Sequence, residues 1–226
     1  MEQPLARTAI AVHDARYGQD LWLRPRSTDL AAFDFVEERY HLPPEIDPPF
    51  DHIAVFGANI GIVLVDLAAR FPEARLLAVE PYAQNAAVAR RNLAPLGDRC
   101  TFVETAVWHE DAELELIWTE DAWGFNLARN VTAEERAEGT HFVKAIEAGA
   151  LLDEFTGGRP VDFSFINIES AWYELLRHGE WTHNVRSLKV EIVDHYEEVV
   201  PLLESLGFRA RLERLSWGGY GVATRP

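Results

Sequence analysis

The chain has 226 residues, 37 of them acidic and 21 basic, and carries a formal net charge of −16 at pH 7. That length predicts one domain, and 48% apolar residues suffice to build a core. A surface this negative repels phosphate groups, so the sequence predicts neither nucleic acid nor an anionic membrane as a partner.

The single cysteine, Cys100, excludes a disulfide within the chain and a paired-thiol metal site. No metal ligands are predicted. The first residues lack the apolar core of a signal peptide, and no run of about 18 apolar residues is long enough to span a bilayer. A cytoplasmic protein is therefore the expectation.

The first fifty residues end in the proline-rich stretch LPPEIDPPFDH. Prolines at this density are typical of an extended linker. We expect residues 1–50 to form an N-terminal cap segment and residues 51–226 to form the main domain.

Strand-like and helix-like segments alternate through the main domain. Apolar runs predict strands, and apolar residues at helical spacing predict helices between them. The strands are expected in RLLAVEP, CTFVETAVW, VDFSFINIE and SLKVEIV, and the helices in IGIVLVDLAARF, AQNAAVARRNLAPLG, SAWYELLRHG and EEVVPLLESLG. Such alternation predicts an α/β fold around a mostly parallel sheet.

Three segments depart from the alternation. RARLERLSW and YGVATRP are separated only by Gly218 and Gly219, which predicts a closing hairpin and an antiparallel edge of the sheet. AELELIWTED and WGFNLARN predict a short β excursion, and the polar run VTAEERAEGTHF predicts a surface loop.

The stretch VFGANIG joins a predicted strand to a predicted helix. Gly57 and Gly61 allow a tight turn and the close approach of a ligand. Glu80 lies nineteen residues after Gly61, at the end of the next strand, where a carboxylate can accept hydrogen bonds from both hydroxyls of a ribose. Together they predict a nucleotide-cofactor site.

Several segments, in order, resemble the S-adenosylmethionine-dependent methyltransferases of the FkbM type. The resemblance is carried by TDLAAFDFVEERY, by VFGANIG with its following helix and AVEP, by TAVWHEDAELEL, by WGFN, by VDFSFINIESAWYELL and by SLKVEI. It implies the class I methyltransferase fold, a Rossmann-like seven-stranded sheet with an antiparallel terminal hairpin. It also implies O-methyl transfer from S-adenosylmethionine to a hydroxyl of a sugar or other small molecule.

The same resemblance assigns the cofactor residues. Gly57, Ala58, Asn59 and Gly61 would line the methionine moiety, Glu80 would hold the ribose, and Ala106 with Val107 would lie near the adenine. Asn167 is also expected to contact the cofactor.

Two stretches of the sequence differ from the family pattern. Val55 stands where family members usually have an acidic residue, and FINIESAW stands where they usually read K-I-D-I-E-G-A-E. Asn167 thus replaces an aspartate, Ser170 a glycine and Trp172 a glutamate. An amide keeps a hydrogen-bond acceptor but cannot act as a general base.

A hydroxyl acceptor requires a group that removes its proton. Glu169, at the end of the fourth sheet strand, is one candidate, and its alternative role is to cap the next helix. Asp194 and His195, after the fifth strand, are the others, although a histidine in a polar stretch is commonly a surface residue.

Trp108 and Trp118 are expected to pack in the interior. Five other aromatic residues are expected either to form a surface for the substrate or to pack in the core: Trp123, Phe125, Trp172, Tyr173 and Trp217.

Two other functions share some of these features. A non-catalytic relative of the same fold would account for Val55, Asn167 and Ser170. A nicotinamide-dependent dehydrogenase would share the glycine turn and Glu80, but GANIG lacks the third glycine spacing of G-x-G-x-x-G. The identity of the acceptor and the oligomeric state are not predicted.

Overall fold

The computed structural model of the chain describes residues 9–34, 36, 41–117, 126–127 and 140–226. Trp118, Trp123 and Phe125, and residues 131–139 of the expected surface loop, lie outside the described residues.

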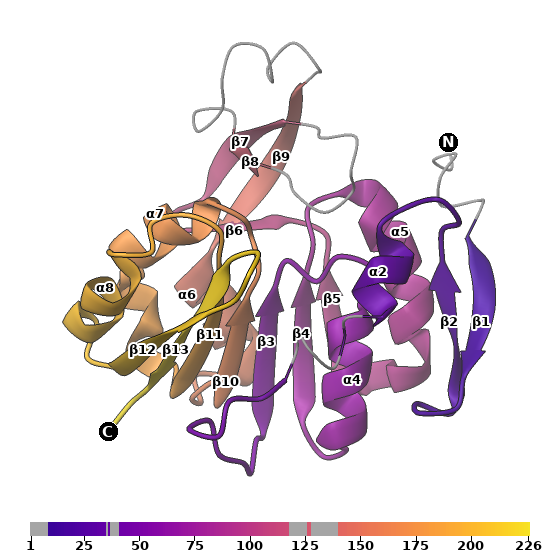
Figure 1. Cartoon of the computed structure of the whole chain (residues 1–226), viewed down its shortest axis with the longest axis horizontal. Coiled ribbons are helices and arrows are strands. Elements are labelled where there is room, and N and C mark those ends of the chain that lie inside the picture. The colour runs from indigo at the N-terminus through magenta and orange to yellow at the C-terminus, as the bar shows by residue number, and fades with distance from the viewer. Residues whose placement is uncertain (1–8, 35, 37–40, 118–125, 128–139) are drawn as a thin grey trace.

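A seven-stranded sheet with the order β12-β13-β11-β10-β3-β4-β5 forms the centre of the molecule (Figure 1). Its strands are β3 (His52–Phe56), β4 (Arg75–Val79), β5 (Cys100–Val103), β10 (Phe163–Ile166), β11 (Ser187–Ile192), β12 (Arg209–Arg214) and β13 (Gly219–Thr224). Neighbours from β11 to β5 are parallel, whereas β13 is antiparallel to both β11 and β12. The predicted α/β fold and terminal hairpin are confirmed.

Helices cover both faces of this sheet. α4 (Ile62–Arg70) and α5 (Ala83–Leu93) pack on one face, and α6 (Ala148–Thr156), α7 (Ala171–Arg177) and α8 (Val199–Ser205) pack on the other. Successive residues of β3 alternate between these two apolar clusters, since Ile53 and Val55 belong to the first and Ala54 and Phe56 to the second. Burial on both faces explains why the parallel strands are continuously apolar.

A second, four-stranded sheet rises above the carboxyl ends of the central strands (Figure 1). It contains β6 (Ala106–Trp108), β9 (Thr140–Glu147), β7 (Ala112–Ile117) and β8 (Asn126–Leu127). The predicted β excursion is therefore present.

The prediction of a surface loop is wrong at its C-terminal end, because β9 begins at Thr140 and includes His141 and Phe142. β9 pairs antiparallel with β7 from Thr140 opposite Ile117 to Ala145 opposite Ala112. These residues form a strand because β7 pairs with them. Their own polar sequence does not indicate that pairing, so it did not predict the strand.

The N-terminal segment forms a hairpin of β1 (Ile10–Asp14) and β2 (Gln19–Leu23), followed by α2 (Asp29–Asp34). The hairpin lies beside α5 (Figure 1). Leu21 and Leu23 are buried in the same apolar cluster as α4. This segment therefore shares a core with the main domain.

A buried amide of α5 fixes the hairpin to the main domain. The Asn92 side chain accepts a hydrogen bond from the Trp22 backbone N–H at 2.6 Å. It donates to the Trp22 carbonyl at 3.1 Å and to the Ile60 carbonyl at 2.7 Å. One side chain thereby joins the hairpin, α5 and the turn before α4.

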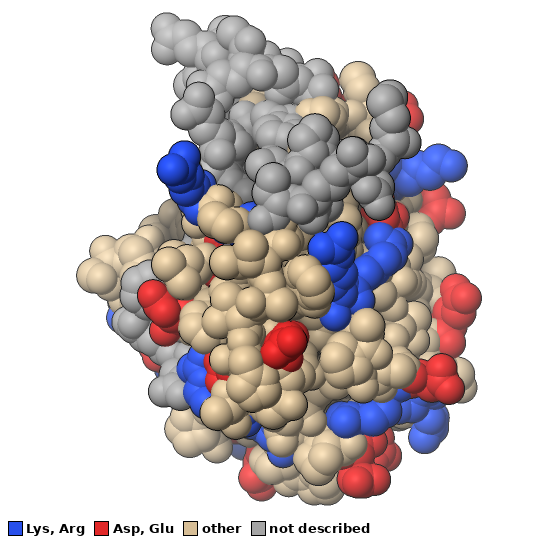
Figure 2. All heavy atoms as spheres, turned by 90° about the vertical axis from the view of Figure 1, so that its right-hand side faces the viewer, with Lys and Arg blue, Asp and Glu red and all other residues tan. Residues whose placement is uncertain are grey.

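Acidic and basic side chains are interspersed on the face that includes the N-terminal hairpin (Figure 2). Within the hairpin, Arg16 pairs with Asp14 at 2.6 Å and His13 lies 3.0 Å from Asp20. The net negative charge of the chain does not make this face uniformly acidic. In the described part of the chain, no helix combines the length and apolarity needed to cross a membrane.

The ends of β3 and β10 approach each other closely at Gly57. Gly57 has a φ of +82°, and a Cβ built on it would lie 1.8 Å from the backbone oxygen of Asn167. No side chain fits that space, and the backbone conformation itself disfavours other residues. Gly57 therefore sets the distance between the two strand ends.

We expect Gly57→Ala to lower the free energy of unfolding by at least about 2 kcal/mol, because the new methyl group displaces a backbone carbonyl and strains φ. The matched control is Gly157→Ala, where φ is +65° and no atom lies within 4 Å of the new Cβ. It should lose only about 1 kcal/mol. Urea unfolding measures both variants, and equal losses would contradict this explanation.

Candidate functional site

A cavity lies at the carboxyl ends of β3, β4 and β10, beneath the second sheet. The space between its walls is about 720 Å³, a figure that includes open solvent. Seven of the residues predicted from the sequence line it: Gly57, Asn59, Glu80, Ala106, Val107, Asn167 and Glu169. Ligands of open α/β sheets bind at this edge.

Glu80, directly after β4, is only 4% exposed. Its Oε2 accepts a hydrogen bond from the Asn59 backbone N–H, and its Oε1 accepts one from the Tyr82 backbone N–H, each at 2.9 Å. Burial raises the pKa of Glu80 to about 7, although these hydrogen bonds act in the opposite direction. These two N–H groups and the side chain of Asn85 use three of the roughly four lone-pair sites of the carboxylate, so a site remains for a further donor.

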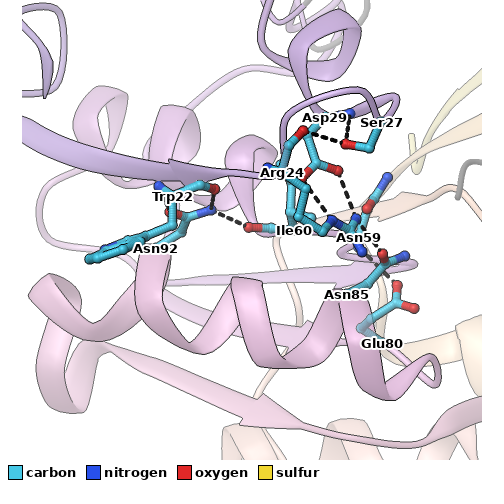
Figure 3. Close-up of polar contacts among 9 residues, drawn as sticks. All are labelled: Trp22, Arg24, Ser27, Asp29, Asn59, Ile60, Glu80, Asn85 and Asn92. Atoms are coloured by element: carbon cyan, nitrogen blue, oxygen red, sulfur yellow. Dashed lines mark hydrogen bonds and ion pairs between the residues drawn. The ribbon is translucent and has the colours of Figure 1, made fainter. Parts of the chain in front are cut away.

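Three residues that the sequence did not predict are connected to Glu80 (Figure 3). Asn85, in the first turn of α5, hydrogen bonds to the carboxylate. Arg24 donates from Nη2 to the Asn85 Oδ1 at 2.7 Å and pairs with Asp29 at 2.7 Å. Two features of the sequence could have indicated these residues. Asn85 is a polar residue on the buried face of α5, and Asp29 lies in TDLAAF, one of the segments that carry the family resemblance.

The glycine turn forms the part of the cavity wall next to Glu80. Asn59 has a φ of +50°, and its Oδ1 is buried without a hydrogen-bond partner among the described residues. A buried acceptor of this kind is an unsatisfied position at which a ligand can donate. Ala58 and Gly61 are not in the lining, because Ala58 packs into the core and Gly61 precedes α4.

The second sheet supplies an apolar wall. Ala106 and Val107 line the cavity together with Trp108, Leu114 and Leu116. Trp108 is buried, as expected. Leu114 and Leu116 were not predicted, because only the pairing of β7 with β9 places them here.

The segment after β10 supplies the polar groups on the remaining side. The Asn167 backbone N–H donates to the Phe56 carbonyl at 2.8 Å, which fixes the end of β10 against β3. Glu169 has a φ of +49° and lines the cavity. Among the described residues, no group of three or more His, Cys, Asp or Glu side chains is arranged to hold a metal ion.

Asp194 and His195 follow β11 and are not among the cavity-lining residues. Asp194 accepts a hydrogen bond from the Trp172 indole Nε1 at 3.2 Å. His195 stacks on Tyr173 with ring centroids 4.1 Å apart. Trp172 itself is fully buried and is therefore a core residue.

Val55 and the partly buried Trp217 also contact the core. Trp217 packs against the apolar cluster of α4, with its ring 5.6 Å from that of Tyr220. Val55 is fully buried in the same cluster and does not line the cavity.

Solved structures with a similar backbone are methyltransferases. The O-methyltransferase from Bacillus cereus in complex with SAH has a TM-score of 0.50, with 15% identity over 89% of this chain and 92% of that one. An O-methyltransferase family protein from Burkholderia thailandensis has a TM-score of 0.50, with 10% identity over 86% of this chain and 56% of that one. The chain has the class I methyltransferase fold. No family model matches the sequence, and no curated protein matches it.

In this fold, an acidic residue at position 55 would enter an apolar cluster. We expect Val55→Asp to lose at least about 3 kcal/mol of unfolding free energy, and more at high pH, because its carboxyl group would be buried without a partner. The nearly isosteric Val55→Thr should lose about 1–3 kcal/mol independently of pH. Urea unfolding at pH 5 and pH 8 distinguishes the two. A Val55→Asp variant as stable as Val55→Thr would contradict the placement of Val55.

Glu80 should make stability depend on pH. The folded chain keeps the Glu80 proton up to a pKa of about 7, whereas the ordinary value is 4.5, so the folded state binds more protons between these values. Its contribution to stability should therefore fall as pH rises from about 4.5 to about 7, by up to about 3 kcal/mol.

Glu80→Gln should remove this part of the pH dependence, whatever its effect on stability at any single pH. Urea unfolding of the parent and the variant at pH 5, 6 and 7.5 measures the difference in slope. Identical slopes would show that Glu80 does not titrate in this range.

Proposed function

We propose that the chain is an S-adenosylmethionine-dependent methyltransferase that transfers the methyl group to a hydroxyl of a small molecule. The observation that carries the proposal is the buried Glu80 carboxylate, which lines the cavity beside the glycine turn that begins at Gly57. The class I fold places such a carboxylate and such a turn together for one ligand.

The residues of the cavity fit this cofactor. Glu80 would hold the ribose by accepting from its hydroxyls, because the carboxylate lines the cavity and has an acceptor site left. The buried Oδ1 of Asn59 would accept from the amino group of the methionine end. Ala106 and Val107 would pack against the adenine, and the absence of a side chain at Gly57 would let the backbone approach the ligand.

The bound cofactor supplies an electrophilic methyl group attached to a sulfonium. The protein must then hold the acceptor hydroxyl in line with that methyl and exclude water. Glu169 lines the cavity and would accept the hydroxyl proton at its carboxylate. Asn167 would orient the acceptor or the cofactor through its amide, because it cannot take the proton.

Two observations support the proposed class of acceptor. The resemblance to FkbM-type methyltransferases favours O-methylation of a sugar or another small hydroxylated molecule. The apolar wall of Trp108, Leu114 and Leu116 favours a ligand with an apolar face. Asp194 and His195, outside the cavity lining, are second choices as the base.

A non-catalytic protein of the same fold is the alternative, and Asn167 is the observation that favours it. The two functions differ in a direct assay. Isothermal titration calorimetry with S-adenosylmethionine and S-adenosylhomocysteine tests the cofactor, and a screen of hydroxylated small molecules with labelled S-adenosylmethionine tests transfer. Firm cofactor binding without any transfer would favour the alternative. No binding of either compound would contradict the methyltransferase and would also favour the alternative.

With an acceptor identified, we expect Glu169→Gln to lower kcat by about 10²–10⁴-fold while leaving S-adenosylhomocysteine affinity within about twofold, because the amide cannot take the proton. His195→Ala is the matched control. It removes a second candidate base outside the cavity lining and should change kcat far less. A larger loss in His195→Ala than in Glu169→Gln would move the base to the end of β11.

A further inference from the structure

We propose that Arg24 of the N-terminal segment is a positioning residue for Glu80, acting through Asn85, and that this segment is therefore part of the cofactor site. The inference rests on the proposed function, because it concerns how the cofactor is held. Arg24 is assigned no contact with the cofactor itself.

The contacts form a continuous chain from α2 to the cavity (Figure 3). The Asp29 carboxylate accepts from the Arg24 backbone N–H at 2.8 Å, from Nε at 2.9 Å and from Nη2 at 2.7 Å. The same Nη2 donates to the Asn85 Oδ1 at 2.7 Å. The Asn85 amide nitrogen is then left to donate to the Glu80 carboxylate, the interaction that contributes to its pKa.

The geometry of this chain requires an arginine. A planar guanidinium can hold a carboxylate with two N–H groups and still direct a donor at an amide. Because the Asn85 oxygen is occupied by Arg24, the amide cannot rotate its oxygen toward Glu80 without losing that hydrogen bond. Arg24 thus fixes which end of Asn85 faces the carboxylate.

Stability alone is a weak explanation for this arrangement. Arg24 and Asp29 are each 2% exposed, and a buried ion pair commonly stabilises a fold no better than apolar residues of similar size. The Arg24 Nη1 is also buried without a hydrogen-bond partner among the described residues, which adds a desolvation cost. A role in holding Asn85 accounts for polar groups at this position.

The charge of Arg24 acts on Glu80 in the same direction as the hydrogen bonds. Burial raises the pKa of Glu80, and the Asn85 hydrogen bond and the Arg24 charge lower it. The other ionisable groups on this side are Asp29, which is paired with Arg24, and the Tyr82 hydroxyl. Removing Arg24 should therefore raise the pH at which Glu80 becomes an ionised acceptor for the ribose.

The test is calorimetric titration of the full chain with S-adenosylhomocysteine between pH 6 and pH 9. The main variant is Arg24→Leu combined with Asp29→Leu, which leaves neither charge unpaired. We expect its affinity to be at least tenfold lower at pH 8, and the pH midpoint of binding to rise by roughly half a unit to one unit. Arg24→Lys keeps the positive charge but lacks the planar guanidinium. It should have the parent pH midpoint but only part of the parent affinity.

Arg16→Gln is the matched control, because it breaks the Arg16–Asp14 ion pair at the other end of β2. It should bind with parent affinity and with the parent midpoint. Asn85→Leu should weaken binding as the main variant does, and combining the two should add little further loss, because both act through one amide.

The outcomes separate the two levels of the proposal. If the parent binds S-adenosylhomocysteine and the folded main variant binds with the same affinity and the same midpoint, the role of Arg24 is overturned. If the main variant does not fold, parent-like binding by both Asn85→Leu and Arg24→Lys overturns it instead. If the parent itself does not bind, the proposed function fails and this inference fails with it.

Discussion

The arrangement of the site depends on one carboxylate kept out of water. Glu80 is buried at the end of β4, and it accepts backbone hydrogen bonds from Asn59, in the turn after β3, and from Tyr82, in the turn before α5. Burying a carboxylate is costly unless several donors surround it. The donors here come from two turns that also form the cavity, so satisfying Glu80 fixes the shape of the cavity at the same time.

The same constraint connects distant parts of the chain. Asn85 and Arg24 continue the polar contacts into the N-terminal segment, and Asn92, about two turns further along α5, fixes the hairpin of that segment. On the other side, the missing side chain of Gly57 brings β10 close enough for Asn167 and Glu169 to reach the cavity. The N-terminal segment therefore shares both the core and the polar network of the main domain.

Features encoded in local sequence were predictable. The glycine turn and Glu80 follow directly from spacing, and the continuous apolar runs indicated a buried parallel sheet. Features that depend on partners distant in sequence were not predictable: β9 is a strand because β7 pairs with it, and Leu114 reaches the cavity through that pairing. Val55 shows the same limit, because only the packing of β3 reveals that its side chain faces an apolar cluster rather than the cavity.

A crystal structure of the chain with S-adenosylhomocysteine would test the central claim most directly. We expect both ribose hydroxyls within hydrogen-bonding distance of the Glu80 carboxylate, the amino-acid end beside Asn59, and the adenine against Ala106 and Val107. A ligand bound elsewhere, or bound in this cavity without contact to Glu80, would contradict the account.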